Sequence, residues 1–318
     1  MERLNKTASK HDDFFIGDLS AQNVILAETE WYSFFGKEFV ILHNPSYRYQ
    51  NNQPYKLNQV TVIFCEKGDA RGSVNLIPYS LKPGGMLIVL PGHIMESYEV
   101  SEDFEGTHIF MSELFLSRLD IGDGYKFYDE VERNPYIQMD QRSSEAIEKY
   151  VVMCRAMLEF KDENPNTEES LRLLTKLFFL MMGWFLHQKA FSQSLSDRPS
   201  DTVGRFINLV KKHYHEHRDV EFYAGEMNMT AKYLSAVVKK TSGKTPLEWI
   251  ENYVILDAKA QLSSTMNTVQ QITYNLHFPM QSFFGRYFKR VVGVSPTDYR
   301  AEARRRVHKL AESQSKTG

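Results

Sequence analysis

Two basic pairs near the C-terminus stand fifty positions apart. The first is Lys239 with Lys240, and the second is Lys289 with Arg290. Lys and Arg side chains bind phosphate oxygens, and Arg also forms paired hydrogen bonds with the edge of a guanine base. The residue types therefore predict a surface that binds a polyanion, provided that the surrounding elements hold both pairs outward.

The basic pairs belong to a longer phrase that occurs twice. Residues 237–246 read VVKKTSGKTP, and residues 287–296 read YFKRVVGVSP. Apolar pairs, basic pairs, glycines and prolines fall in register, which indicates one supersecondary unit used twice. In each copy a helix ends in a cationic turn and a glycine suited to a left-handed cap, and a hydroxyl residue with proline then begins the next helix.

The residues before the first copy predict a helix-turn-helix unit. A short helix over 222–227 precedes Asn228, a residue type that tolerates the left-handed conformation of a tight turn. Thr230 is placed to cap a second helix that runs to about residue 241. The spacing i, i+3, i+4, i+7 gives this helix a buried face, which consists of Leu234, Val237, Val238 and Thr241. The outward face then holds Lys232, Ser235, Ala236 and Lys239.

The second copy repeats this design. Thr268 and Gln271 form the capping pattern of a short helix, and His277 takes the position of Asn228 at the turn. The following helix, from about residue 280 to 292, is expected to bury Phe283 or Phe284 together with Tyr287 and Phe288. Its outward face then holds Gln281, Ser282, Gly285, Arg286 and Lys289.

A single connecting helix is predicted between the two units, from Pro246 to about Leu262. Thr245 and Glu248 form a capping-box pattern at its start. Its apolar stripe consists of Trp249, Tyr253, Leu256 and Ala260. At 1.5 Å per residue the helix is roughly 25 Å long, which suits two recognition helices about one DNA turn, roughly 34 Å, apart. The spacing suggests that one chain reads two successive major grooves.

This arrangement resembles the DNA-binding domain of the AraC/XylS family of bacterial transcription regulators, over about residues 202–300. The phrase FPMQSFFGRYFKR at 278–290, followed by GVSPTDYR at 293–300, carries the resemblance. Asn228 and His277 replace the glycine that is common at each turn, and Ala236 stands where Arg is often found. The first unit is therefore expected to read DNA through an apolar contact with a thymine methyl group, or to contribute mainly backbone contacts.

The outward faces and the resemblance together assign roles to particular residues. Contacts with bases are expected from Lys232, Ser235, Ala236, Gln281, Ser282 and Arg286, and contacts with phosphates from Lys239 and Lys289. Residues 201–318 hold 18 Lys and Arg against 11 Asp and Glu, whereas residues 1–200 hold 20 against 29. A polyanion partner explains this division, although a solvated face on a helical domain would explain the charge alone.

The first part of the chain has a β-rich pattern. Short runs of β-branched and aromatic residues at 39–42, 59–65, 74–79 and 86–90, with turns at 66–69 and 82–85, predict a small antiparallel barrel or sandwich. Residues 79–93 resemble the cupin-like effector-binding domain that precedes the DNA-binding domain in many AraC-type proteins. The fold class expected is α+β, a cupin-like β-barrel with a helical pair followed by an all-α domain.

A cupin fold raises the alternative of a metal-dependent enzyme fused to a DNA-binding module. Such a site needs several His and carboxylate ligands around one ion. The N-terminal histidines, which include no His-x-His pair, are His11, His43, His93, His108 and His187. His213, His215 and His217 are two apart, about 200° around a helix, so they do not converge. The sequence therefore predicts no catalysis, no metal and no cofactor.

Two helices are predicted after the strands. The first has a stripe of Ile147, Val151, Cys154 and Leu158. The second, from residue 171 to 191, is apolar nearly all the way round, which requires cover on two sides, and its apolar run is too short to span a bilayer. By analogy with the family, the pair is expected to form a homodimer interface. Burial within the same subunit is the alternative.

The expected organisation has four parts. These are a cupin-like effector domain at 1–140, a dimerisation hairpin at 141–191, a linker at 192–200 and a DNA-binding domain at 201–310. The polar N-terminus and the isolated Cys65 and Cys154 favour a cytoplasmic protein. Ligand contacts stay unassigned among Trp31, Tyr47, Arg48, Tyr49, Tyr55 and His93. The predicted function is a sequence-specific regulator, with activation favoured, that binds double-stranded promoter DNA, contacts RNA polymerase and responds to a small-molecule effector.

Overall fold

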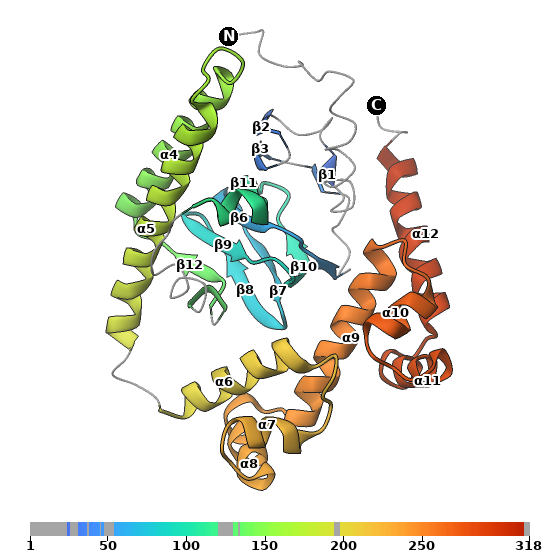
Figure 1. The fold of residues 1–318 in the computed structure, drawn as a ribbon. Helices are drawn as coiled ribbons and strands as arrows, with labels where there is room; N and C mark the ends of the chain where they lie inside the picture. The colour runs from blue at the N-terminus through green and yellow to red at the C-terminus, as the bar shows by residue number, and fades with distance from the viewer. Residues whose placement is uncertain are drawn as a thin grey trace. The chain divides into compact units, whose positions relative to one another are not determined.

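The chain forms two compact units (Figure 1). In this computed structural model the described residues are 24–25, 31–36, 38–44, 46–47, 54–119, 130–132, 134–193 and 198–314. The first unit holds most of the residues up to 189, and the second holds residues 190–318 with two short segments, 53–56 and 75–77. No helix in the described ranges combines the length and the apolarity that crossing a membrane requires.

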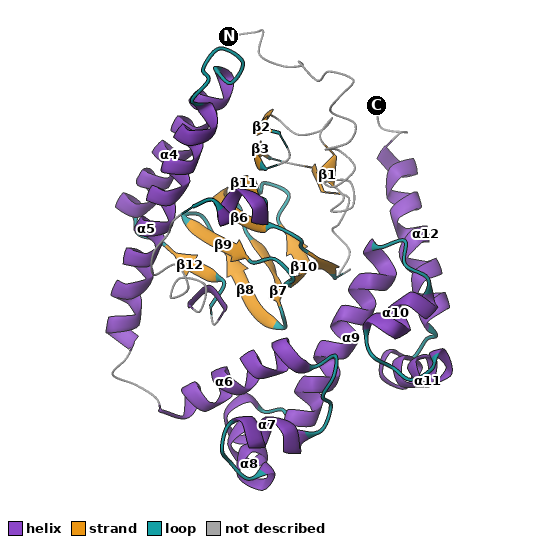
Figure 2. Ribbon diagram, viewed as in Figure 1, coloured by secondary structure: helices purple, strands orange, loops and turns teal. Residues whose placement is uncertain are grey.

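The first unit is built on antiparallel β-sheets (Figure 2). The strands of the chain are β1 Val24–Ile25, β2 Trp31–Phe35, β3 Phe39–His43, β4 Ser46–Tyr47, β5 Tyr55–Lys56, β6 Val60–Lys67, β7 Ala70–Val74, β8 Ile77–Leu81, β9 Gly85–Val89, β10 Ile94–Val100, β11 Glu105–Met111 and β12 Tyr136–Gln138. All of them belong to the first unit except β5 and the first residue of β8, which are counted with the second. The larger sheet has the order β12-β9-β6-β11-β3-β2, a smaller one has the order β5-β10-β7-β8, and β1 pairs with β4. A β-rich domain before a helical one confirms the predicted α+β class.

Most of the predicted strand positions are confirmed. The segments 39–42, 59–65 and 86–90 fall largely in β3, β6 and β9. The segment 74–79 is wrong as a single strand, because Asn75 and Leu76 have φ angles of 48° and 65° and turn the chain between β7 and β8. Leucine rarely adopts positive φ, so an apolar residue at this point suggested a strand where the backbone makes a turn.

Two long helices of the first unit, α4 Gln141–Glu159 and α5 Thr167–Gln193, lie side by side (Figure 1). The predicted stripe of α4 is confirmed, because all its members are buried: Ile147, Val151, Cys154 and Leu158. The ring of Tyr150 stacks on that of Phe178 in α5 at a centroid distance of 5.0 Å. The helical pair therefore shares one apolar core with the larger sheet.

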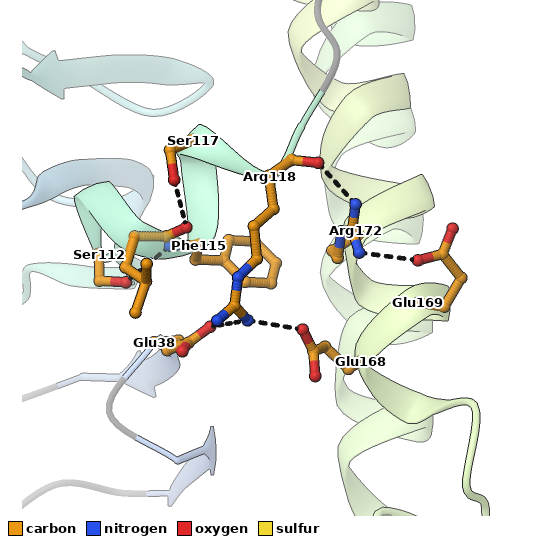
Figure 3. Close-up of polar contacts among 9 residues, drawn as sticks. Glu38, Ser112, Phe115, Ser117, Arg118, Glu168, Glu169 and Arg172 are labelled. Carbon is orange, nitrogen blue, oxygen red and sulfur yellow. Dashed lines mark hydrogen bonds and ion pairs between the residues drawn. The ribbon is translucent and has the colours of Figure 1, made fainter.

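Polar contacts fix the start of α5 beside the short helix α2 Glu113–Ser117 (Figure 3). Arg118 donates to Glu38 at 3.4 Å and to Glu168 at 2.9 Å. Arg172 donates to the Arg118 carbonyl oxygen at 2.6 Å and pairs with Glu169 at 3.1 Å. Exposed ion pairs of this kind contribute little stability each, so their main effect is to orient α5.

The second unit is helical. Its helices are α6 Arg198–His213, α7 Val220–Glu226, α8 Ala231–Ser242, α9 Pro246–Ser264, α10 Val269–Asn275, α11 Gln281–Val292 and α12 Pro296–Gln314. Helices α7 and α8 pack near one end of α9, and α10 and α11 near the other (Figure 1). The predicted linker boundaries stay a prediction, because residues 194–197 between α5 and α6 lie outside the described residues.

The connecting helix α9 is buried over most of its surface. Its predicted stripe of Trp249, Tyr253, Leu256 and Ala260 is confirmed as buried. The residues around the rest of the helix, Ile250, Val254, Ile255, Ala258 and Leu262, are buried as well. Because helices pack on several sides of α9, this helix supplies one continuous core to both helix-turn-helix units.

Candidate DNA-binding surface

The turn in each helix pair depends on one residue with positive φ. Asn228 between α7 and α8 has φ 55°, and His277 between α10 and α11 has φ 50°. The next backbone N–H closes the same hydrogen-bonded ring in both units, from Met229 to the Ala224 carbonyl at 2.9 Å and from Phe278 to the Thr273 carbonyl at 3.0 Å. The prediction that these two residues adopt the left-handed conformation at the turns is confirmed, and the two turns have the same backbone geometry.

The predicted caps are also present. The Thr230 hydroxyl accepts from the Tyr233 N–H at 3.2 Å and begins α8. Capping boxes begin α9 at Thr245 and α10 at Thr268. The left-handed glycines that end α8 and α11 are Gly243, with φ 75°, and Gly293, with φ 91°. Both second helices therefore begin and end where the repeated phrase predicts.

The second helix of each helix-turn-helix unit, α8 or α11, buries one face against the core. Leu234 and Val238 of α8 and Phe284 and Phe288 of α11 are fully buried. Val237 is only half-buried, and Thr241 is exposed, because the core contact of α8 ends before its last turn.

The alternative left open for α11 is resolved in favour of Phe284. Tyr287 of the predicted buried face is only half-buried. Phe283 is 46% exposed and lies on the outward side of the helix. An exposed aromatic ring is thus part of the second candidate recognition surface.

The predicted contact residues lie on the faces opposite the buried ones. The exposed members are Lys232, Ala236, Lys239, Gln281, Ser282, Arg286 and Lys289, and Ser235 is half-buried. The structure thus brings each set together on one helix. The contacts of these residues with DNA stay a prediction.

The two arginines of α11 have different environments, which the sequence pattern did not predict. The Arg286 guanidinium carbon lies 4.7 Å from the centroid of the Phe283 ring three residues earlier. Arg290 lies 5.2 Å from the Tyr287 ring and also forms an ion pair with Glu251 of α9. Since Arg290 already has a carboxylate partner, Arg286 and Lys289 are the better placed cations for an external ligand.

A buried carboxylate of α9 binds the residues that directly follow α6. Asp257 is fully buried and accepts hydrogen bonds from the Tyr214 hydroxyl at 2.7 Å and His215 Nε2 at 3.0 Å. Lys56, in the same compact unit, places Nζ 3.4 Å from this carboxylate. Burial raises the pKa of Asp257, but the hydrogen bond from His215 and the charge of Lys56 outweigh it and lower the pKa to about 2.

His215 therefore has a structural partner. The sequence signal for this contact was Asp257 itself, an acid that follows three apolar residues in the middle of α9. Among the described residues, no group of three or more His, Cys, Asp or Glu side chains is arranged to hold a metal ion.

Comparisons with known proteins agree with this architecture. Residues 223–302 match the family model described as a helix-turn-helix domain. The chain is 21% identical over 244 residues to the HTH-type transcriptional activator RhaS of Mannheimia succiniciproducens, a match that covers 75% of this chain and 85% of that protein. It is 27% identical over 124 residues to the arabinose operon regulatory protein of Escherichia coli, covering 39% of this chain and 42% of the relative.

Two solved structures also align with parts of the chain. ToxT from Vibrio cholerae aligns with 83% of this chain and 98% of its own length, at 16% identity and a TM-score of 0.39. The DNA-binding domain of AdpA, solved in complex with a target DNA, aligns with 35% of this chain and 96% of its own length, at 27% identity and a TM-score of 0.31.

Two helix-turn-helix units on one connecting helix, each with an outward polar and basic face, define a DNA-binding transcription regulator. The helix-turn-helix match and the relatives narrow this description. Residues 223–302 carry a helix-turn-helix domain, and the chain is similar to transcription regulators of the AraC/XylS family.

Proposed function

We propose that this regulator binds promoter DNA in the cytoplasm through both helix-turn-helix units and activates transcription by contact with RNA polymerase, without catalysing a reaction itself. The observation that carries the proposal is the duplication of one backbone geometry, with positive φ at Asn228 and His277 and an outward polar face on the helix after each turn. A recognition helix after such a turn is the element that enters the major groove.

The two units would read DNA with different chemistry. In α11 the exposed Gln281 and Arg286 supply groups that pair with adenine and guanine edges. At the position that corresponds to Arg286, α8 has Ala236, which offers only an apolar contact to a thymine methyl group. Most of the base discrimination should therefore come from α11, with Lys239 and Lys289 binding phosphates in both units.

The β-rich domain is the proposed site of a small-molecule effector. Relatives named after the arabinose, raffinose and lactose operons support a sugar as the class of effector. Of the candidate ligand contacts, Tyr55 and His93 are buried, and His93 Nε2 lies 2.7 Å from Glu132. Of the other candidates, the side chains of Trp31 and Tyr47 and all of Arg48 and Tyr49 lie outside what the structure describes.

A second copy of the chain is the proposed partner of α5. Four large apolar side chains of this helix are half exposed or more, and they follow the spacing i, i+4, i+7, i+11 of one helical face: Leu173, Leu177, Leu180 and Trp184. The opposite face of α5 packs into the core through Leu171, Phe178 and Met182. A self-complementary stripe of this kind suits a two-fold dimer, because each residue meets its counterpart on the other subunit.

Sedimentation equilibrium tests the dimer. The full chain should sediment as a dimer at about micromolar concentration, and Leu177→Glu should shift it to monomer. Leu247→Glu is the matched control, because Leu247 is 57% exposed but lies on α9, outside the stripe. Monomer alone for the unmodified chain would remove the proposed interface.

The proposed function is tested by selecting duplexes from a randomised DNA pool with the full chain. The affinity of the selected duplex is then compared with that of a scrambled one at about physiological salt. Enrichment of a bipartite motif with sub-sites about ten base pairs apart is the expected result. If no motif is enriched, the selection is repeated with residues 201–318 alone. Enrichment by that fragment would mean that the full chain is held inactive without its effector, and no enrichment would contradict sequence-specific reading.

A further inference from the structure

Arg218 links the two helix-turn-helix units directly. It lies in the loop between α6 and α7, next to Asp219, whose side chain caps the N-terminus of α7. Its guanidinium donates to the carbonyl oxygen of Leu276 and lies 3.8 Å from the centroid of the Phe278 ring. Leu276 and Phe278 flank the positive-φ turn residue His277 of the second unit. A side chain of the first helix-turn-helix unit is therefore bound at the turn of the second helix-turn-helix unit.

The chemistry of this contact suits arginine in particular. Leu276 is the C-terminal cap of α10, and the last carbonyl groups of a helix carry partial negative charge. The planar guanidinium donates to that oxygen while one face lies against Phe278, a combination that the point charge of lysine does not reproduce. Burial lowers the pKa of Arg218, which indicates that the contact is partly removed from water.

A second contact lies beside the first. The ring of His215 is 6.3 Å from the ring of His277, and Nε2 of His215 is bound to the Asp257 carboxylate of α9. The segment that follows α6 thus contacts both the connecting helix α9 and the turn of the second helix-turn-helix unit. The two recognition helices are joined by α9 and also by this lateral contact.

We propose that Arg218 fixes the position of α8 relative to α11 and thereby determines the spacing of the two DNA sub-sites that the chain accepts. The inference rests on the proposed function. One inserted base pair moves the second sub-site by about 3.4 Å and rotates it by about 35° around the duplex axis. When α8 and α11 are fixed both by α9 and by the Arg218 contact, they cannot follow that displacement. When α9 alone joins them, bending of α9 lets them move toward the displaced sub-site.

The test measures binding of the full chain to the selected duplex and to versions with one base pair inserted or deleted between the sub-sites. The unmodified chain should lose about a hundredfold in affinity on either change, comparable with one or two mismatched base pairs. Arg218→Ala should bind the original spacing less tightly, by about three- to tenfold. Its further loss on the altered spacings should be less than about tenfold, because the lateral constraint is gone.

Arg300→Ala is the matched control. Arg300 Nε donates to the Leu262 carbonyl at the end of α9 at 3.2 Å, and burial also lowers its pKa. This contact joins α12 to α9 and does not involve the first helix-turn-helix unit, α7 and α8. Arg300→Ala should therefore leave the ratio of affinities for the original and altered spacings unchanged.

Two further variants guard against misfolding. Arg218→Lys keeps the charge, and Phe278→Leu keeps an apolar side chain but removes the ring. Each should relax the spacing preference as Arg218→Ala does. A uniform loss on every spacing for all Arg218 variants, or an equal relaxation by Arg300→Ala, would overturn the proposal. Absence of any enriched motif with the unmodified chain and with residues 201–318 would instead overturn the proposed function on which it rests.

Discussion

The buried carboxylate of Asp257 should make the stability of the second unit depend on pH. Its pKa is about 2 in the folded chain, against an ordinary value of 3.8. The difference corresponds to about 2 kcal/mol of unfolding free energy at neutral pH. Because the folded pKa is the lower one, the contribution is complete above pH 3.8 and is lost as the pH falls from 3.8 towards 2.

The perturbation is Asp257→Asn, and urea unfolding monitored by the fluorescence of the buried Trp249 is the assay. Trp31 and Trp184 are replaced by Phe in all samples so that the signal reports the second unit. At neutral pH the variant should unfold with about 2 kcal/mol less free energy than its reference, and this deficit should shrink between about pH 4 and pH 2.

A matched variant separates charge from hydrogen bonding. Tyr214→Phe removes one donor to Asp257 but leaves the carboxylate charged, with His215 Nε2 still 3.0 Å away. It should cost about 1 kcal/mol at every pH at which the carboxylate is ionised. A deficit for Asp257→Asn that does not change with pH, or a variant as stable as the reference at neutral pH, would refute the reasoning.

Three further predictions concern the DNA surface and the helix ends. Arg286→Ala should cost about 1 to 3 kcal/mol in operator binding and relax the preference at one base pair, while Lys289→Ala should weaken all sequences alike and flatten the salt dependence; equal losses of Arg286→Ala on specific and random DNA would contradict that division. Phe283→Leu removes the ring beside Arg286, so it should weaken operator binding about two- to fivefold and have no effect when Arg286 is already Ala; equal losses in both backgrounds would count against a positioning role. Gly243→Ala should lower the free energy of unfolding by about 1 kcal/mol because φ is 75° there. Gly204→Ala, inside α6 with open space around it, should instead raise the free energy of unfolding by up to about 1 kcal/mol. Thermal unfolding measures both variants, and shifts of the same sign would rule out this account.

The parts of the fold that the sequence predicted depend on interactions between near neighbours. Asn228 and His277 tolerate the left-handed region by themselves, and the Thr245 and Thr268 caps bond to residues only three positions away. Helix boundaries around each turn could therefore be derived from residue types and spacing. The duplicated phrase added an internal check, because each copy predicted the other.

The parts that could not be predicted depend on contacts between distant positions. Tyr214 and Asp257 are separated by 43 residues, and Arg218 and Leu276 by 58. No periodicity indicates which of many polar side chains will meet in the folded chain. The turn at Leu76 was missed for a related reason, since its positive φ is imposed on a residue type that does not favour it.

The two helix-turn-helix units have the same backbone geometry but different exposed side chains. The pair of units is therefore not symmetric. At matching positions of the two recognition helices stand Ala236 and Arg286, so that one end of the surface carries a guanidinium and the other a methyl group. Rotating a single chain by half a turn on a duplex would place each end on the wrong sequence. With the base contacts proposed above, a site for one chain has a defined direction, and inverting the site relative to neighbouring DNA would reverse the order of α8 and α11 along the duplex.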